Sequence, residues 1–294
     1  MALFPNSISI QAAESLGLSP PELRALIERA LEEDLGEGDV TTALTVPGGM
    51  EARGTFAAKE TLVVAGLPVA AEVFRVLEPS LAWETVVEDG TEVEPRARLA
   101  VVNGSAASLL AGERTALNFL QHLSGIATMT RRLSRLVGVK AELLDTRKTT
   151  PGLRSLQKYA VRVGGGRNQR LRLDDGILIK DNHLRLTGGI REAVERARRN
   201  CVPGSQIEVE VGSMAELDEA IRAGADVVLL DNMTPAEVAE CVQRAQGRVR
   251  LEVSGGINAD NIHSYAETGV DHISVGALTH SAPAVDINFK IEPL

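Results

Sequence analysis

The chain after Lys140 alternates short apolar runs with stretches of helical periodicity, and each run ends in a charged, polar or small residue. Strand alternating with helix is typical of parallel βαβ units. The last four run ends are spaced 21 to 23 residues apart, which fits one strand plus one helix per unit. We therefore expect a β/α barrel, complete or open, with a doubly wound open sheet as the alternative. The six runs occupy residues 141–148, 176–183, 207–213, 226–232, 249–256 and 271–278.

The first half of the chain has a different pattern, which predicts a smaller α/β domain. Apolar residues at helical spacing predict a helix over residues 21–34. From 50 to 104, short β-like runs are punctuated by Gly, Pro and Asp, with a helix over 68–78 among them. Residues 105–125 are predicted as a helix, which a break at Gly125 separates from the next one.

Composition limits the class of protein. The chain of 294 residues is long enough for one large or two ordinary domains. A net charge of −9 and an aromatic content of 3% argue against a nucleic-acid-binding protein. We expect no membrane span and, in residues 1–17, no signal peptide. Cys201 and Cys241 have the spacing of neither a disulfide framework nor a zinc site, so we expect a cytoplasmic protein.

Positive charge is concentrated in one segment of this acidic chain. Ten lysines and arginines lie between Arg147 and Arg185 against three aspartates, a net charge of +7. Such a segment needs an anionic partner or acidic neighbours in the fold, although a solvated helix face paired with surface carboxylates is the alternative. At its start, Arg147 and Lys148 follow a run end and offer a guanidinium fork and a point charge to carboxylate or phosphate.

Two further features of this segment indicate anion chemistry. Gly164, Gly165 and Gly166 predict a loop whose backbone an anion can approach closely, with an ordinary flexible loop as the alternative. Lys180 falls inside an apolar run that suggests a buried strand. An ammonium there is expected to pair with a ligand anion, to act as an amine nucleophile, or to reach the surface along its own stem.

The polar run ends form one group if the fold is a barrel, because chemistry in β/α barrels occurs at the C-terminal ends of the strands. Carboxylates at such a mouth, here Glu208, Glu210 and Asp231, suit sugar hydroxyls or water-bound Mg²⁺, or pair with the basic segment. The late runs end in SGGI (254–257) and VGAL (275–278), which resembles the phosphate site often found after the last barrel strands.

Taken together, these motifs resemble the quinolinate phosphoribosyltransferase family over nearly the whole chain. The similarity is carried by EDLGEGDVTT (33–42), GERTALNFLQHLSGIAT (112–128), DTRKTTPGLRSLQKYAVRVGGG (145–166), LIKDNH (178–183), EVEV (208–211), LLDNM (229–233), EVSGGI (252–257) and ISVGALTHSAPAVDINFKI (273–291).

The resemblance implies an α/β fold with two domains and a pentosyltransferase activity. An N-terminal α/β sandwich (1–115, with the tail 280–294 packed back on it) would precede an open, TIM-like β/α barrel (116–279). The enzyme would transfer phosphoribosyl from 5-phosphoribosyl 1-pyrophosphate to quinolinate, releasing pyrophosphate and CO₂ and giving nicotinate mononucleotide for NAD biosynthesis. Mg²⁺ would be bound through pyrophosphate and water, near Glu210 and Asp231, and not by a protein metal site. A homodimer, or a higher homo-oligomer of dimers, is implied.

The resemblance also assigns roles to residues by motif. Lys148, Lys180, Glu210 and Asp231 would be catalytic. Arg114 would reach the neighbouring subunit's site. The family's Asn-His-Arg is Asn-Gln-Arg here, so Gln169 can donate a hydrogen bond but carries no charge. The full substrate-binding set would be Arg114, Thr146, Arg147, Lys148, Gln169, Arg170, Lys180, Glu210 and Asp231, with Ser254, Gly255, Gly256, Gly276, Ala277 and Leu278 around the 5′-phosphate.

Two alternatives remain at the level of sequence. A Schiff-base lyase would use Lys180 as its nucleophile. A paralogue of the same fold that is associated with molybdate transport would share the motifs without the activity.

Overall fold

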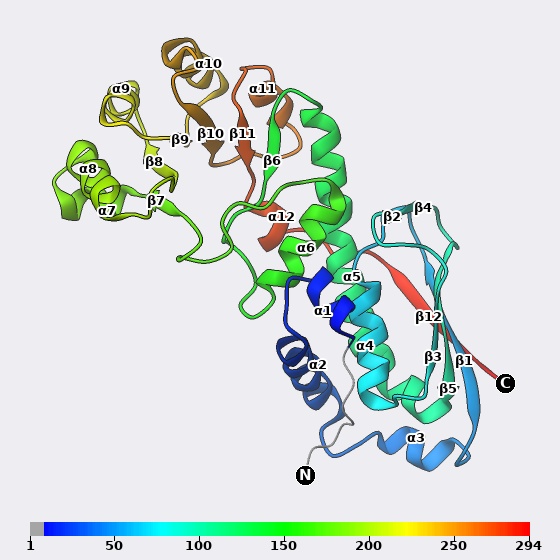
Figure 1. Ribbon diagram of the computed structural model, residues 1–294. Coiled ribbons are helices and arrows are strands. Elements are labelled where there is room, and N and C mark those ends of the chain that lie inside the picture. The colour runs from blue at the N-terminus through cyan, green and yellow to red at the C-terminus, as the bar shows by residue number, and fades with distance from the viewer. Residues whose placement is uncertain (1–8) are drawn as a thin grey trace. The chain divides into compact units, whose positions relative to one another are not determined.

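A computed structural model describes residues 9–294, so the prediction for residues 1–17 lies partly outside the described residues. The chain divides into two compact units, each described by itself (Figure 1). The first comprises the chain up to Arg131 together with 150–165 and 281–294, and the second comprises 132–149 and 166–280. Residues 116–131 thus group with the first unit, whereas the sequence placed the division at residue 115.

One long helix runs through Gly125 and past Arg131, where the first segment of this unit ends. Helix α5 (Ala106–Val137) is continuous, so the predicted break at Gly125 is wrong. A methyl group at Gly125 would lie 2.1 Å from the carbonyl oxygen of Pro283. The glycine therefore lets the C-terminal segment approach the helix closely, and it has a packing role instead of ending the helix.

The first unit is built on a four-stranded antiparallel sheet, with α4 packed against one face. Phe56 of the sheet contacts Phe74 of α4 and Phe289 of the C-terminal strand, with ring centroids 6.1 and 4.5 Å apart. The sheet order is β12 (Ile287–Pro293), β1 (Glu51–Ala58), β5 (Arg98–Ser105), β3 (Ala82–Thr85). The other elements are β2 (Leu62–Val63), β4 (Glu92–Val93), α1 (Ile10–Ser15), α2 (Pro20–Leu35), α3 (Val40–Thr45), α4 (Leu67–Leu77) and α6 (Arg154–Gly164).

The second unit contains six parallel strands, one for each apolar run predicted from the sequence. They are β6 (Glu142–Leu144), β7 (Ile177–Ile179), β8 (Ile207–Val211), β9 (Val227–Asp231), β10 (Arg250–Ser254) and β11 (His272–Ser274), in the order β6-β11-β10-β9-β8-β7. From β7 to β11 the order follows the chain without reversal. Among the described residues β6 and β7 are the two end strands and do not pair with each other, so this is an open barrel and not a doubly wound sheet.

Helices return the chain from each strand end to the next strand start, and α8, α9 and α10 lie along one side of the sheet (Figure 1). Their starts are encoded locally: Ser213 caps α9, and Thr234 forms a capping box with Glu237 ahead of α10. The helices are α7 (Asp181–Thr187), α8 (Ile190–Asn200), α9 (Met214–Ala223), α10 (Pro235–Ala245), α11 (Ile262–Ala266) and α12 (Ala277–His280). Across residues 9–294, every helix is too short or too polar to cross a membrane.

Candidate functional site

A cavity of about 440 Å³ opens at the C-terminal ends of the barrel strands in the second unit. Parallel pairing brings these ends to one edge of the sheet, as Ser254 opposite Asp231 in the β10–β9 register illustrates. The cavity gathers nine of the residues that the sequence assigned to the site. These are Thr146, Arg147, Lys148, Gln169, Arg170, Lys180, Glu210, Asp231 and Ser254.

Two arginines give the cavity its positive wall. The Nε atoms of Arg147 and Arg170 are buried, and neither has a hydrogen-bond partner among the described residues. Burial, together with repulsion from Arg147, lowers the pKa of the Arg170 guanidinium. A buried donor without a partner is costly, so this wall is suited to an anionic ligand that supplies the missing acceptors.

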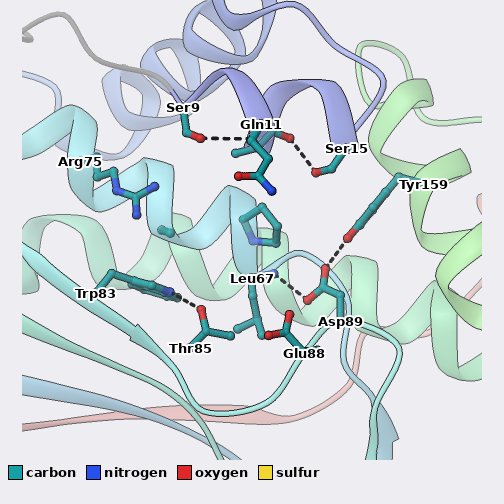
Figure 2. A pocket seen from close by; sticks show the side chains of 13 residues that line it. Ser9, Gln11, Ser15, Leu67, Arg75, Trp83, Thr85, Glu88, Asp89 and Tyr159 are labelled. Atoms are coloured by element: carbon teal, nitrogen blue, oxygen red, sulfur yellow. Dashed lines mark hydrogen bonds between the residues drawn. The ribbon is translucent and has the colours of Figure 1, made fainter.

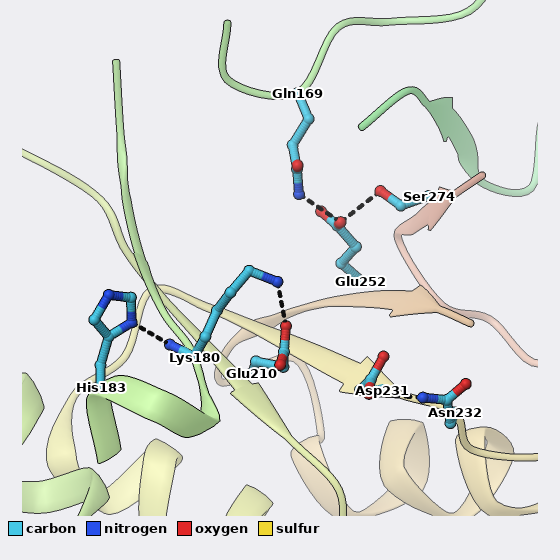
Figure 3. Close-up of polar contacts among 8 residues, drawn as sticks. All are labelled: Gln169, Lys180, His183, Glu210, Asp231, Asn232, Glu252 and Ser274. Atoms are coloured by element: carbon cyan, nitrogen blue, oxygen red, sulfur yellow. Dashed lines mark hydrogen bonds and ion pairs between the residues drawn. The ribbon is translucent and has the colours of Figure 1, made fainter. Parts of the chain in front are cut away.

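Lys180 lies directly after β7, at the rim of the cavity (Figure 3). Its side chain is 47% exposed, and Nζ forms a 2.6 Å ion pair with Glu210 on the neighbouring strand β8. The prediction that Lys180 is buried within a strand is therefore wrong, because β7 ends at Ile179. An ion-paired, half-exposed ammonium does not have the desolvated environment of a Schiff-base nucleophile.

Asp231 ends β9 and is followed by a constrained turn. Asn232 has a φ of 56°, and its amide Nδ2 donates a 2.7 Å hydrogen bond to Asp231 (Figure 3). A methyl group at Gly255 would lie 2.2 Å from Asn232 Oδ1. Glycine is therefore required where the loop after β10 passes the loop after β9.

The residues predicted for the 5′-phosphate follow two neighbouring strands. Ser254 lines the cavity, while Gly255 and Gly256 form the next turn, with φ values of 104° and 64°. Gly276 comes after β11, where a methyl group would lie 3.0 Å from Lys148 Cδ. Gly255, Gly256, Gly276, Ala277 and Leu278 do not line the cavity, and Leu278 is fully buried. Only their backbone groups could therefore serve a phosphate.

Two sets of residues that the sequence predicted for the site lie outside the cavity. Gly164 ends α6 and packs against α5, where a methyl group would lie 2.5 Å from Thr130 Cβ, and Gly165 caps the helix with a φ of 95°. The predicted anion-binding glycine loop is therefore a packed helix end, and its glycines are absent from the cavity lining. Arg114 is an exposed residue of α5 in the first unit, and it does not line the cavity either.

The sequence interpretation missed the polar floor of the cavity. Glu252, Ser274 and Asn232 line it, as do Leu178 and Leu229. Glu252 could have been found, because it alternates with Ser254 along an otherwise apolar strand and so faces the same side of the sheet. Ser274 is the last residue of the next strand, β11.

The first unit has a cavity of its own, of about 490 Å³, shown in Figure 2. Its lining includes Arg75, Trp83 and Tyr159, and the Tyr159 hydroxyl donates a 2.7 Å hydrogen bond to Asp89. Asp89 also accepts from the backbone N–H groups of Gly66 and Leu67 at the start of α4. These contacts stabilise a helix N-terminus, and no residue that the sequence assigned to the site lies there.

Two family models match consecutive parts of the chain. The N-terminal domain of quinolinate phosphoribosyl transferase matches residues 39–124, and the C-terminal domain matches 126–290. Together they span most of the chain.

Individual relatives are similar over almost their whole length. A Mycobacterium leprae protein named nicotinate-nucleotide pyrophosphorylase [carboxylating] is 45% identical, covering 91% of this chain and 96% of its own. A Bacillus subtilis protein with the same name, marked probable, is 41% identical, covering 92% and 93%. The crystal structure of NadC from Streptococcus pyogenes has a TM-score of 0.90 at 38% identity, covering 94% of this chain and 99% of its own. The structure of nicotinate-nucleotide pyrophosphorylase from Francisella tularensis has a TM-score of 0.89 at 41% identity, covering 92% of this chain and 96% of its own.

Proposed function

Because this chain belongs to the quinolinate phosphoribosyltransferase family, we propose that it transfers phosphoribosyl from 5-phosphoribosyl 1-pyrophosphate to quinolinate. The products are nicotinate mononucleotide, pyrophosphate and CO₂. The observation that carries the proposal is the barrel cavity, which is lined by Arg147, Arg170, Lys180, Glu210 and Asp231. The buried Nε atoms of the two arginines have no hydrogen-bond partner within residues 9–294. We propose that this site binds a dicarboxylate and a pyrophosphate together.

The reaction asks for positioning and charge stabilisation more than for covalent chemistry. The bond from the anomeric carbon to pyrophosphate breaks as the quinolinate nitrogen attacks that carbon. Negative charge then grows on the departing pyrophosphate, and Lys148 and Lys180 are proposed to stabilise it. Arg147 and Arg170, with Gln169, would hold the two quinolinate carboxylates. No covalent protein intermediate is proposed.

Glu210 and Asp231 are proposed to hold the ribose hydroxyls. Their carboxylates stand at the ends of neighbouring strands β8 and β9, where they can accept hydrogen bonds from a sugar. Within residues 9–294 no cluster of three or more acidic, His or Cys side chains could hold a metal ion unaided. Mg²⁺ is proposed to arrive with the pyrophosphate, which supplies ligand oxygens, and water would complete its shell.

The last step replaces a carboxylate by hydrogen. After N-glycosylation the ring is a pyridinium, which accepts the electron pair left by the departing CO₂ at the adjacent carbon. That carbon then takes up a proton. The loops that follow β10 and β11, including Gly255, Gly256 and Gly276, are proposed to bind the 5′-phosphate through their backbone N–H groups and so anchor the ribose meanwhile.

We further propose a homodimer, or an assembly of such dimers, in which Arg114 completes the neighbouring subunit's site. Support comes from the exposure of Arg114 on α5 and from its absence among the cavity-lining residues of its own chain. Cys201 and Cys241 are both free thiols, in keeping with a proposed cytoplasmic location.

The test is direct. The protein is incubated with quinolinate, 5-phosphoribosyl 1-pyrophosphate and Mg²⁺, and nicotinate mononucleotide is measured by chromatography. Product that requires all three components supports the proposal, and no product under any condition rejects it. Borohydride trapping with a keto substrate tests the lyase alternative, for which the ion-paired environment of Lys180 gives no support.

A further inference from the structure

The floor of the barrel cavity contains a buried carboxylate that the proposed reaction does not use. Glu252 is 2% exposed and lies in the middle of β10. One of its oxygens, Oε1, accepts a 2.7 Å hydrogen bond from Gln169 Nε2 and another from the Ser274 hydroxyl (Figure 3). Glu252 therefore fixes the side chain of Gln169, which itself lines the cavity.

A second carboxyl group lies beside Glu252. Glu208 on β8 is hydrogen-bonded to Glu252 through the side chains, and its Oε1 is buried with no partner among the described residues. Burial and the neighbouring Glu252 raise the pKa of Glu208 to about 8. Burial also raises the pKa of Glu252, but the hydrogen bonds from Ser274 and Glu208 act in the opposite direction. Glu252 already accepts hydrogen bonds from Gln169 and Ser274, whereas the buried Oε1 of Glu208 has no partner among the described residues, so Glu208 is the donor of the pair and Glu252 the acceptor.

We propose that Glu208 and Glu252 hold one proton between them at neutral pH and act as positioning residues for quinolinate. Glu252, as the carboxylate, orients Gln169. Glu208, as the neutral acid, does not form an ion pair with Arg170, so the Arg170 guanidinium stays available for a carboxylate of the substrate. This inference rests on the proposed function, because quinolinate is the ligand to be positioned.

The charges around the pair support this division of roles. Arg170 faces Glu208 from the segment after β6, and Lys180 faces both carboxyl groups from the end of β7. Asp145, directly after β6, faces Glu252, while its own oxygens accept hydrogen bonds from Gln169 N and the Asn168 amide. Lys180 is already paired with Glu210.

Arg170 is therefore the cation that ionised Glu208 would bind. Two ionised carboxylates at this floor would also repel a dicarboxylate ligand. A shared proton removes one of the two charges and keeps the Arg170 guanidinium available. As Glu208 loses its proton at alkaline pH, quinolinate binding should weaken.

Two measurements on the full chain test the proposal, each with the wild type, Glu208→Gln and a matched control. Glutamine keeps the size and the hydrogen-bond donor of the neutral acid. Glu84→Gln removes an exposed carboxylate of the first unit. Infrared difference spectra between pH 6 and pH 10, without ligand, report a protonated carboxylic acid. Calorimetry between pH 7 and pH 9.5 reports the Kd of quinolinate.

We expect an acid band in the wild type that vanishes on raising the pH and is missing from Glu208→Gln. Above the pKa of Glu208, the wild-type Kd should rise toward about tenfold per pH unit, the limit for one linked proton. Glu208→Gln should bind with a nearly constant Kd, and Glu84→Gln should follow the wild type.

The inference is overturned if the wild type has no such band, or if Glu208→Gln keeps the alkaline rise in Kd. Failure of the proposed function gives a different result. If the band behaves as expected but quinolinate binds at no pH, the shared proton stands, and the substrate assignment is rejected together with the positioning role.

Discussion

Lys180 and Glu210, 30 positions apart in the sequence, form a 2.6 Å ion pair at the C-terminal ends of neighbouring strands. The pair holds the ammonium of a half-exposed lysine at the rim of the barrel cavity. An incoming pyrophosphate would compete with Glu210 for this ammonium, which links binding of the leaving group to release of a carboxylate toward the ribose.

Replacing Lys180 should lower the activity with little change in the stability of the protein. Lys180→Met is expected to lower kcat/KM on the order of 100-fold, since it removes one cation from the growing charge of the leaving group. Stability should change by only about 1 kcal/mol, because the Lys180 side chain is 47% exposed and solvent screens its pair with Glu210. Steady-state kinetics and thermal unfolding check both. Lys59→Met is the matched control, because Lys59 forms an exposed pair with Asp286 in the first unit. Equal losses in both variants would contradict the role of Lys180.

The turn after β10 offers a paired test of backbone strain. Gly255→Ala should destabilise the protein by about 1–3 kcal/mol, because φ is 104° and the new methyl group would meet Asn232. At Gly256 φ is 64°, but a new methyl group would meet no atom within 4 Å. Gly256→Ala should therefore destabilise the protein less than Gly255→Ala. Urea unfolding of the two variants measures the difference. If Gly256→Ala were the more destabilising, the close approach to Asn232 would not be the cause.

Stability should depend on pH through Glu208. Its pKa in the folded protein is raised, to about 8 from an ordinary 4.5, so the folded state binds the proton more tightly than the unfolded state. The stabilisation is complete below about pH 4.5 and is lost as the pH rises through about 8. The loss is on the order of a few kcal/mol.

Thermal unfolding at pH 5 and pH 8.5 measures this effect. The wild type should lose more stability between the two values than Glu208→Gln, while Glu84→Gln should behave as the wild type does. An equal loss in the wild type and Glu208→Gln would show that another group carries the pH dependence.

The proposed dimer predicts complementation between two inactive variants. Arg114→Ala and Lys180→Met damage different residues of the shared site. After subunit exchange, half of the dimers are mixed, and each mixed dimer has one intact site, so about a quarter of the wild-type activity should return. Activity of the mixture is compared with that of each variant alone. No recovery after verified exchange would place Arg114 in the site of its own subunit.

Much of the barrel could be predicted from sequence, because each parallel strand is a short apolar run with a polar residue where it reaches the rim. The role of a residue could not be predicted where it depends on contacts with a distant segment of the chain or on where a strand ends. Gly125 suggested a helix break, yet it is a glycine because Pro283 passes close to it. Gly164 suggested a loop, yet it packs against Thr130. Lys180 seemed buried because its run is apolar, but the strand ends one residue earlier.

In the candidate site, too, strand-end residues could be predicted and tertiary contacts could not. Strand-end residues such as Glu210 and Asp231 were found from the rule that barrel chemistry occurs at strand ends. Glu252 lies two residues before the end of β10, and its alternation with Ser254 was a signal for its side of the sheet. Its hydrogen bond to Gln169 could not be predicted, because the two residues are 83 positions apart.

The central claim is that quinolinate is glycosylated and decarboxylated in one active site. The most direct test uses quinolinate labelled in the carboxylate next to the ring nitrogen and measures released CO₂ and nicotinate mononucleotide together. The account predicts equal amounts of both, only when 5-phosphoribosyl 1-pyrophosphate is present, and a loss of both in Lys180→Met. Release of CO₂ without 5-phosphoribosyl 1-pyrophosphate, or no nucleotide product at all, would contradict it.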